Sequence, residues 1–294
     1  MLSCRIPGRE SARDVSCCRL ALVHQRCVPR VRRYPSDTSD GQWQVIDALL
    51  PDPAWLGIHG GRPEQHCRRQ IVDAIFYLVD NGIKWRAMPS DFPPWSTVYN
   101  YFAAWAAAGV TIDLLDILRQ RVRIAEGRTA TPTAAVIDSQ SVRAAETVWH
   151  SSRGFDAAKK VNGRKRHLAV DTLGLLICVI VTAANVQDRD GARPLLTRLA
   201  AVCDRIRLVW ADAGYAGALL DWARQTFNLA IQIVKRTEPH RFVVLPRRWV
   251  VERTLAWITR HRRCARDYEG LPTHHEAMVC WAMIRITSQR LARR

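Results

Sequence analysis

Acidic residues end two apolar segments of the chain, where they could hold metal ions. Asp138 ends the apolar run 134–137, and Asp212 ends a second apolar run at 206–211. Both runs have the pattern of buried strands that deliver an acid to a sheet edge. Carboxylate oxygens are the ligands that hard divalent cations prefer. We therefore expect the two aspartates to lie together at one edge and to bind a divalent cation.

A third carboxylate, Glu252, lies in the stretch 247–253, whose pattern predicts a helix. Such a helix can bring Glu252 across the sheet edge toward Asp138 and Asp212. Phosphodiester cleavage by two metals needs carboxylates that bridge and flank cations about 4 Å apart. The three acids together predict a site of this kind, in which Asp138 is the natural bridging ligand.

Each of these acids also has a simpler interpretation. Taken singly, either aspartate could only cap the turn that follows its strand. Two apolar strands that each end in Asp favour a shared role, because a buried carboxylate without a partner is costly. Arg248 lies four residues before Glu252 on one helical face. It could hold a DNA phosphate there or form an ordinary surface ion pair with Glu252.

The segment from residue 134 onward alternates between strand and helix patterns. The patterns predict strands at 134–138, 167–171, 175–182, 206–211 and 229–234, and helices at 193–203, 217–227, 247–264 and 274–291. Three strands followed by helix, strand, helix, strand and helix make a mixed α/β order. The ribonuclease-H-like fold has this order, with acids on its first and fourth strands and on a following helix. We expect a mixed five-stranded sheet with helices over 134–294.

The segment 36–126 has helical periodicity instead. It predicts a first helix from about Trp43 and further helices at 68–79, 98–107 and 111–123. Residues 127–133 are expected to link these helices to the sheet. A helix, a short element and a capped helix resemble a helix-turn-helix, whose second helix would present Tyr99 and Asn100 to base edges. The alternative is a plain helical bundle whose aromatic residues form its core.

The chain is strongly basic. Its formal net charge is +17 and its pI is about 10.2. Lysine and arginine bind phosphates and release condensed counterions, so nucleic acid is the expected partner. The alternative is a generally basic composition with no such partner. Candidate DNA contacts are basic residues of the polar stretch 151–166 and of the predicted helix around Glu252: Lys159, Lys160, Arg164, Lys165, Arg166, Arg253 and Arg260.

Cysteine usage and hydropathy indicate a cytoplasmic protein. The nine cysteines form no Cys-x-x-Cys pair, and several lie in apolar runs, as buried free thiols do. This pattern indicates a reducing cytosol and no structural zinc. No apolar run approaches the roughly 20 residues that cross a bilayer, and no signal peptide is evident. Residues 1–35 are expected to be a disordered basic extension, with a DNA-binding arm as the alternative and Val31 as a hypothetical native start.

Specific sequence blocks surround the three acids, and further, different blocks lie elsewhere in the chain. The blocks around the acids are 137–142, 211–217 and 249–254, and others stand at 38–43, 61–63, 84–89, 93–99, 163–167, 171–174 and 184–192. In this order, they resemble the blocks of DDE transposases of the bacterial insertion-sequence-5 type, within the broader insertion-sequence-4-like superfamily. The resemblance extends from about Tyr34 to the C-terminus.

This resemblance implies a ribonuclease-H-like catalytic domain behind a small helical DNA-binding domain, with Asp138, Asp212 and Glu252 as the catalytic triad. It implies two Mg²⁺ or Mn²⁺ ions per active site. The implied reaction is cleavage at the 3′ ends of an insertion sequence, bound through its terminal inverted repeats, and joining of those ends to target double-stranded DNA. A homodimer or larger assembly on DNA, associated with the nucleoid, would hold the two ends together.

The third block of the superfamily carries Tyr, Arg, Glu and Lys at set spacings. Arg248 and Glu252 match it, whereas Leu245 stands where the Tyr would be and Thr259 where the Lys would be. Arg260, one residue further on, is a candidate substitute for the Lys.

Other residues and functions stay open at this point. Asp188 and Asp190 could also bind metal, although capping of the following helix is the favoured interpretation. His167 is expected to pack in its strand or to contact DNA. Two rival functions are a two-metal DNA nuclease without strand transfer and a DNA-binding relic that has lost catalysis.

Overall fold

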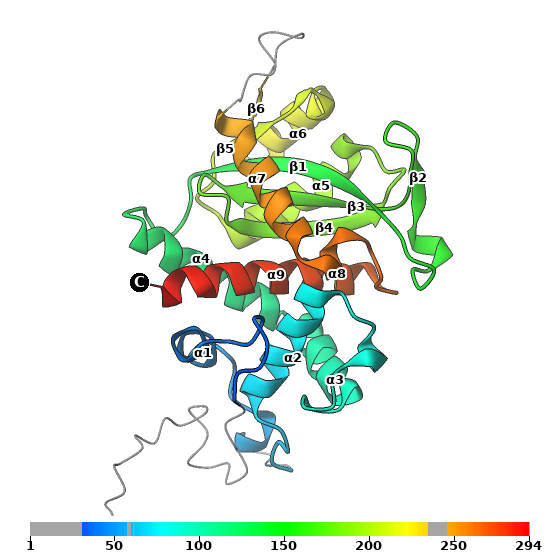
Figure 1. The fold of residues 1–294 in the computed structure, drawn as a ribbon. Helices are drawn as coiled ribbons and strands as arrows, with labels where there is room; N and C mark the ends of the chain where they lie inside the picture. Colours follow the sequence, from blue (N-terminus) through cyan, green and yellow to red (C-terminus); the bar gives the residue numbers. More distant parts are fainter. Residues whose placement is uncertain (1–30, 58–59, 61, 235–245, 294) are drawn as a thin grey trace, which may run out of the picture.

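A computed structural model of the chain describes residues 31–57, 60, 62–234 and 246–293 (Figure 1). Within these ranges, a sheet with its own helices lies on one side and the N-terminal helices lie on the other. The long helix α9 (Pro272–Ala292) runs between them. Residues 1–30 of the predicted basic extension lie outside the described residues.

The strands in the described part of the chain form one six-stranded mixed sheet. They are β1 (Ala134–Arg143), β2 (Gly154–Asp156), β3 (Val161–Asp171), β4 (Leu176–Ala183), β5 (Leu208–Ala211) and β6 (Ala230–Ile233). β3 pairs antiparallel with β1, β2 and β4, whereas β5 pairs parallel with β1 and β6. The mixed sheet confirms the predicted fold class. β2 is a strand that the sequence patterns did not predict.

Two strand boundaries differ from the prediction. β1 continues past Asp138 to Arg143, so Asp138 lies in the middle of the strand and not at its end. From Ala135 onward, β1 pairs with β3 in one register, from Asp171 back to Gly163. The polar stretch 151–166, expected to be a basic segment between strands, contributes β2 and the first half of β3. It can enter the sheet because its charged side chains find buried partners.

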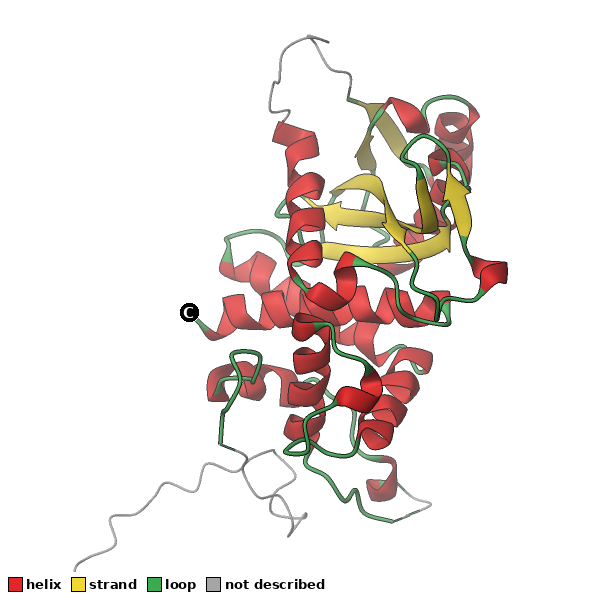
Figure 2. Cartoon of the chain, turned by 45° about the vertical axis from the view of Figure 1, so that its right-hand side comes forward, coloured by secondary structure: helices red, strands yellow, loops and turns green. Residues whose placement is uncertain are grey.

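Helices cover both faces of the sheet (Figures 1 and 2). The helices of the sheet segment are α5 (Asp188–Val202), α6 (Ala218–Phe227), α7 (Pro246–Arg260), α8 (Arg262–Ala265) and α9. Along β1, Ala135 and Ile137 belong to the core with α5 and α6, whereas Val136 belongs to the core with α7 and α9. This alternation follows from the period of two in a strand that is buried on both faces.

The N-terminal helices have the predicted order. They are α1 (Asp40–Asp47), α2 (Arg68–Asn81), α3 (Trp95–Ala107) and α4 (Val110–Ala125), with the 3₁₀ turn η2 (Trp85–Ala87) between α2 and α3. Ser39 caps α1 by accepting a hydrogen bond from the Gln42 amide at 3.1 Å. Gly82 ends α2 in the left-handed conformation at φ 68°, which favours glycine. Both helix ends therefore have residues that suit their positions, a serine at the N-cap and a glycine at the C-terminus.

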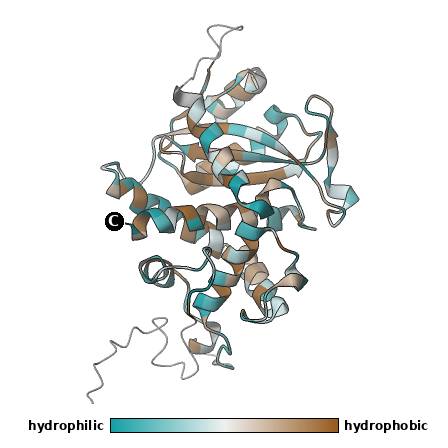
Figure 3. Ribbon diagram, viewed as in Figure 1, coloured by the Kyte–Doolittle hydropathy of each residue, from teal (hydrophilic) through white to brown (hydrophobic). Residues whose placement is uncertain are grey.

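The N-terminal helices share one hydrophobic core with the C-terminal helix. Trp281 of α9 is fully buried, with ring centroids 5.8 Å from both Phe76 of α2 and Trp105 of α3. Arg123 of α4 forms a buried ion pair with Asp171 of β3 at 2.6 Å. Hydrophobic residues run along α9 and along the sheet in Figure 3. The two segments that we predicted as separate domains thus pack closely against each other, and α9 belongs to the core of both.

The described cysteines are buried free thiols: Cys67, Cys178, Cys203, Cys264 and Cys280. Burial raises the pKa of Cys178, Cys264 and Cys280 to about 12, so these groups pack as small apolar side chains. Within the described ranges, no single helix is long and apolar enough to cross a membrane. The bent pair of α3 and α4 passes that test together, by length and composition only.

Candidate active site

Asp138 lies on β1, and Asp212 directly follows the end of the neighbouring strand β5. β1 and β5 pair in parallel from Ala134 with Leu208 to Val136 with Trp210. Continuing this register by two residues sets position 138 beside position 212. The backbone at residue 212 is still extended, with φ −83° and ψ 178°. Because paired strands lie about 4.8 Å apart, this continued register would start the two side chains from neighbouring backbone positions.

Both aspartates lie on the face of the sheet that α7 covers. Val136 and Trp210 pack into the core with α7, and positions 138 and 212 follow them by the strand period of two. α7 packs against β1, β3 and β5 through its buried residues, and Glu252 is an exposed residue next to buried Val251. The three predicted acids therefore belong to one side of the sheet.

Tyr215 lies among the carboxylates at this edge. It belongs to the 3₁₀ turn η4 (Ala213–Tyr215), and its side chain is fully buried. Burial raises the pKa of Tyr215 well above its ordinary value, and the negative charges of Asp138, Asp188 and Asp212 raise it further. The phenol stays protonated beside three acids and is available to them as a hydrogen-bond donor. Tyr215 was not among the residues predicted for the site from the sequence.

Asp188, at the start of α5, brings a further carboxylate close to Asp212. A Cβ atom added at Gly214 would lie 3.1 Å from Asp212 Oδ1 and 3.8 Å from Asp188 Oδ2. Asp188 Oδ1 accepts a hydrogen bond from the Ser139 hydroxyl at 2.8 Å and lies 2.9 Å from Lys165 Nζ. Burial opposes ionisation, but the hydrogen bonds from Lys165 and Ser139 lower the pKa of Asp188 overall.

These contacts revise the interpretation of Asp188 as a simple helix cap. The N-cap position of α5 is Gln187, whose side chain makes no capping hydrogen bond, and the side chain of Asp188 bonds across to β1 and β3 instead. Asp190, in the same helical turn, is exposed. Only Asp188 of the two therefore has contacts that reach the candidate site.

Three of the basic residues expected to contact DNA are buried in the sheet. Arg164 pairs with Asp267, Arg166 donates a hydrogen bond to Cys264 O at 2.9 Å, and Lys165 pairs with Asp188. Their side chains point into the protein because β3 is a central strand with helices on both faces. The structure thus assigns them internal contacts in place of the DNA-facing surface that we expected.

The remaining predicted contacts have mixed exposure. Lys159, Lys160, Arg260 and Asn100 are exposed, whereas Tyr99 is half-buried and packs edge-on against Trp85 at 5.1 Å. Arg253 is half-buried, with its guanidinium 4.6 Å from the ring centroid of Trp249 and 4.7 Å from that of Trp257. Leu245 and the side chain of Arg248 lie outside what the structure describes.

His167 is a packing residue of β3. It is fully buried, its Nε2 lies 3.0 Å from Thr182 Oγ1, and Gly191 of α5 packs directly against its ring. Burial lowers the pKa of His167 to about 4, so the imidazole is neutral at physiological pH. These contacts support the packing alternative and leave no ring face for DNA.

The acids suit a divalent metal by chemistry and by placement. They offer only carboxylate oxygens, which Mg²⁺ and Mn²⁺ prefer, and Asp138 and Asp212 lie on the face where α7 carries Glu252. Among the described residues, no group of three His, Cys, Asp or Glu side chains already stands in a metal-ligating arrangement. By the chemistry of their oxygens, the three acids fit a divalent metal.

Comparison with known proteins bears on both halves of the chain. Residues 129–286 match the family described as "Transposase DDE domain", and residues 38–115 match the family described as "Putative transposase of IS4/5 family". A "Putative transposase for insertion sequence element IS402" from Burkholderia cepacia is 31% identical over 143 residues, which cover 44% of this chain and 68% of that protein. The "Uncharacterized protein y4sN" of Sinorhizobium fredii is 28% identical over 105 residues, covering 36% of this chain and 74% of that protein. The region that matches the transposase DDE domain, residues 129–286, contains all three candidate acids.

Proposed function

This chain belongs to the transposase DDE domain family, of the IS4/5 type, and from that membership we propose a specific reaction for it. We propose that it binds the terminal inverted repeats of an insertion sequence, cleaves the DNA at the 3′ ends and joins those ends to target DNA. The observation that supports this most directly is the parallel register of β1 and β5. Continued by two residues, this register would bring Asp138 beside Asp212 on the face of the sheet that α7 covers, which supports the proposal.

In this proposal Asp138, Asp212 and Glu252 hold two Mg²⁺ or Mn²⁺ ions. When bound, such ions lower the pKa of the attacking water or 3′-hydroxyl and stabilise the leaving oxygen. Asp138 is the central ligand because it lies between β3 and β5 in the middle of the sheet. The buried phenol of Tyr215 lies close enough to feel the charges of Asp138 and Asp212, and its role in this proposal is to help orient them, as outer groups commonly do around metal ligands.

Exposed cations at the β2–β3 turn and at the end of α7 are proposed to bind the DNA backbone. Lys159 and Lys160 stand at the β2–β3 turn, and Arg260 ends α7. Contacts of this kind position DNA without reading its sequence. We propose that Asn100, exposed on α3, and Tyr99 contribute to recognition of the terminal repeat, and that two copies of the chain assemble to hold two ends.

The test is incubation of purified protein with labelled DNA that carries the terminal repeat of its element, with and without Mg²⁺. We expect metal-dependent nicking at the repeat boundary, loss of nicking in Asp138→Ala and Glu252→Gln, and unchanged binding of the repeat in both variants. Undiminished nicking in either variant would overturn the assignment of the triad.

The same assay separates the proposal from its rivals when a second, unlabelled duplex is added. Joining of the labelled 3′ ends to that duplex is expected for a transposase. Nicking without joining would indicate a nuclease, and binding of the repeat without nicking would indicate a protein that has lost catalysis.

A further inference from the structure

A groove lies between the N-terminal helices and the sheet segment, and its lining does not include the three candidate acids. Its volume is about 890 Å³. One wall is η2 with the start of α3, and the other is the loop that follows β1 together with the turn between α8 and α9. We call it the Trp149 groove, and its residues include Lys84, Arg86, Trp95, Trp149, Arg266 and His274. The volume lies in the range of small-ligand sites, roughly 300–1,000 Å³, so the groove suits a few nucleotides and not a duplex.

Aromatic rings line this groove, and one of them is open to solvent. The side chain of Trp149 is 57% exposed. Across the groove, the guanidinium of Arg86 lies 4.9 Å from the ring centroid of Trp95. An exposed indole face is a stacking platform for an unpaired base, because every base has a π-face that can lie on it.

Cations outnumber acids in the lining. Lys84, Arg86 and Arg266 are exposed, and Glu146 is the exposed acid of the groove. The remaining charges are a buried pair, Arg263 with Glu269 at 2.7 Å, which compensate each other. Burial lowers the pKa of His274, so this lining residue is neutral at physiological pH. The surplus of positive charge favours a phosphate-bearing ligand.

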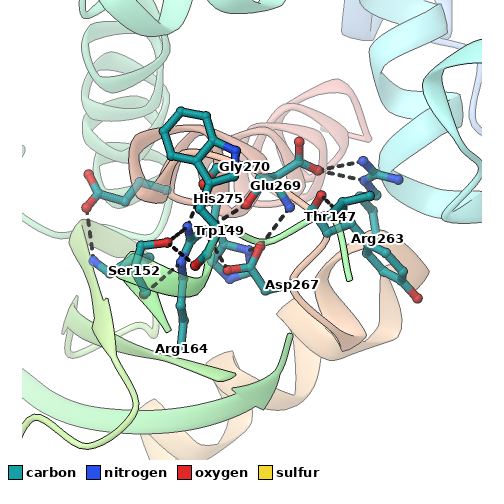
Figure 4. A network of polar contacts seen from close by, with 12 residues as sticks. Thr147, Trp149, Ser152, Arg164, Arg263, Asp267, Glu269, Gly270 and His275 are labelled. Carbon is teal, nitrogen blue, oxygen red and sulfur yellow. Dashed lines mark hydrogen bonds and ion pairs between the residues drawn. The ribbon is translucent and has the colours of Figure 1, made fainter. Parts of the chain in front are cut away.

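A buried polar network holds the floor of the groove (Figure 4). Arg164 is 0% exposed, and its guanidinium donates to Asp267 Oδ2 at 3.0 Å, Glu269 O at 2.8 Å and Gly270 O at 2.6 Å. His275 Nδ1 lies 3.2 Å from Asp267 Oδ1. Asp267 thus receives a charged partner from β3 and an imidazole from α9. The turn at 267–270 is therefore fixed from two elements.

The loop that carries Trp149 is tied to the same turn. Thr147 Oγ1 donates to Tyr268 O at 2.7 Å, and the Ala145 amide donates to Asp267 O at 2.7 Å. The indole of Trp149 lies against Gly270, where an added Cβ would stand 3.4 Å from Nε1 (Figure 4). The exposed ring is held in place by its supports, and a preorganised platform loses little entropy when a ligand binds.

The groove also lies within reach of the candidate active site. β1 runs directly from Asp138 to Arg143, and the loop with Trp149 follows. Five residues of strand span about 17 Å. The candidate acids and the Trp149 groove are therefore joined by one continuous stretch of chain, which consists of β1 and the loop that follows it.

We propose that the Trp149 groove binds an unpaired stretch of the DNA on which this chain acts, with one base stacked on Trp149 and phosphates on Lys84, Arg86 and Arg266. The proposal rests on the transposase function for its DNA, but the groove itself is separate from the triad. It adds a site for one strand of an opened end, at the loop to which β1 leads from Asp138.

The test measures binding of a single-stranded thymidine oligonucleotide that contains one 2-aminopurine, without Mg²⁺ so that no cleavage occurs. We expect Trp149→Ala to weaken binding by about 5- to 150-fold, since stacking of one base on an aromatic ring contributes that much. Trp149→Phe should restore most of the affinity. The quenching of 2-aminopurine on binding should be lost in Trp149→Ala and retained in Trp149→Phe.

The matched control is Phe155→Ala, because Phe155 is also a largely exposed aromatic residue, at 56%, but lies on β2 outside the groove. This variant should bind the oligonucleotide like the unmodified chain. Substitution of Lys84 or Arg266 by Ala should lower the salt dependence of binding by about 0.7 in log–log slope for each cation. Equal losses in Trp149→Ala and Phe155→Ala, or an equal loss on a fully paired duplex, would overturn the proposal.

Failure of this inference can be distinguished from failure of the proposed function. If Trp149→Ala binds the oligonucleotide normally while the unmodified chain nicks its terminal repeat, only the groove assignment is wrong. Suppose instead that the unmodified chain does not nick its terminal repeat, and that Trp149→Ala binds the single-stranded oligonucleotide more weakly than the unmodified chain. The groove assignment then stands, and the proposed catalytic function is wrong.

Discussion

The Ser139 hydroxyl donates a hydrogen bond to Asp188 Oδ1 at 2.8 Å, and this contact joins the strand of Asp138 to the first turn of α5. Lys165 of β3 binds the same oxygen at 2.9 Å. The residue next to Asp138 is thereby held from the face of the sheet opposite α7. Since outer contacts orient the groups that ligate a metal, Asp188 is expected to position Asp138 from behind.

Asp188→Asn keeps an acceptor for Ser139 and removes the charge that Lys165 neutralises. We expect nicking of the terminal repeat to fall by about 10- to 100-fold, the usual effect of removing such an outer contact. The Mg²⁺ concentration for half-maximal nicking should rise as well. The control is Asp190→Asn, in the same helical turn but exposed, which should change neither quantity. Similar effects of the two substitutions would count against the positioning role of Asp188.

The buried pair of Arg164 and Asp267 is expected to stabilise the fold and the Trp149 groove together. Arg164→Met leaves Asp267 with less positive charge in a buried site, so the free energy of unfolding should fall by about 3–5 kcal/mol. Urea denaturation measures this change. Arg205→Met, at an exposed position, should stay within about 0.5 kcal/mol of the unmodified chain. A loss as small as that of the control would mean that Arg164 is dispensable for the network.

The parts of the fold that depend on local pattern were predictable from sequence. The apolar runs before Asp138 and Asp212 are strands, Gly82 ends a helix, and the helix around Glu252 forms as expected. Placing the two aspartates near each other needed only the assumption that the two strands pair in parallel. These features follow from backbone periodicity and capping, which a short window of sequence contains.

The polar stretch at the start of β3 was not predictable in the same way. As a charged residue in a polar stretch, Arg164 is expected at the surface. It is buried because it pairs with Asp267, which lies 103 residues further along the chain. Lys165 likewise finds Asp188 on another element. A charge can be buried only when such a partner is present, and no local pattern shows that partner. The same reason explains why the tie between Asp188 and Ser139, and the shared core around α9, emerged only from the structure.

Asp73 of α2 should give the folded chain a distinctive pH dependence. Its carboxylate is buried and accepts hydrogen bonds from the Thr38 amide and hydroxyl, both at 2.8 Å. Burial raises the pKa of Asp73 from 3.8 to about 6. The folded state therefore binds this proton more tightly than the unfolded state, and the contribution of Asp73 to the free energy of unfolding rises as pH falls from about 7 to about 4.

Asp73→Asn removes that dependence while keeping an acceptor for Thr38. At pH 8 the variant should be more stable than the unmodified chain by about 1–3 kcal/mol, and the difference should shrink toward pH 4. His167 acts in the opposite direction, because burial lowers its pKa to about 4 and its contribution is lost as pH falls below about 6.5. The Asp73→Asn variant and the unmodified chain both contain His167. The difference between their free energies of unfolding, measured by urea denaturation, therefore reports the contribution of Asp73. A difference that does not vary with pH would contradict the prediction.

Divalent metal should stabilise the folded chain through the adjacent positions of Asp138 and Asp212. The parallel register brings two carboxylates side by side, and a bound cation offsets their mutual repulsion. Because the unfolded chain has no such arrangement, Mn²⁺ at 100 times its dissociation constant should stabilise the folded state by about 2.7 kcal/mol. For a chain of this length, that corresponds to a rise of about 5 °C in Tm.

Thermal denaturation in Mn²⁺ and in EDTA measures this effect without any cleavage assay. Asp212→Asn should lose most of the Mn²⁺-dependent rise in Tm. Asp204→Asn, at an exposed position before β5, should keep the full rise. If Asp212→Asn responds to Mn²⁺ as the unmodified chain does, the cation binds elsewhere, and the two aspartates are neighbours without being a metal site.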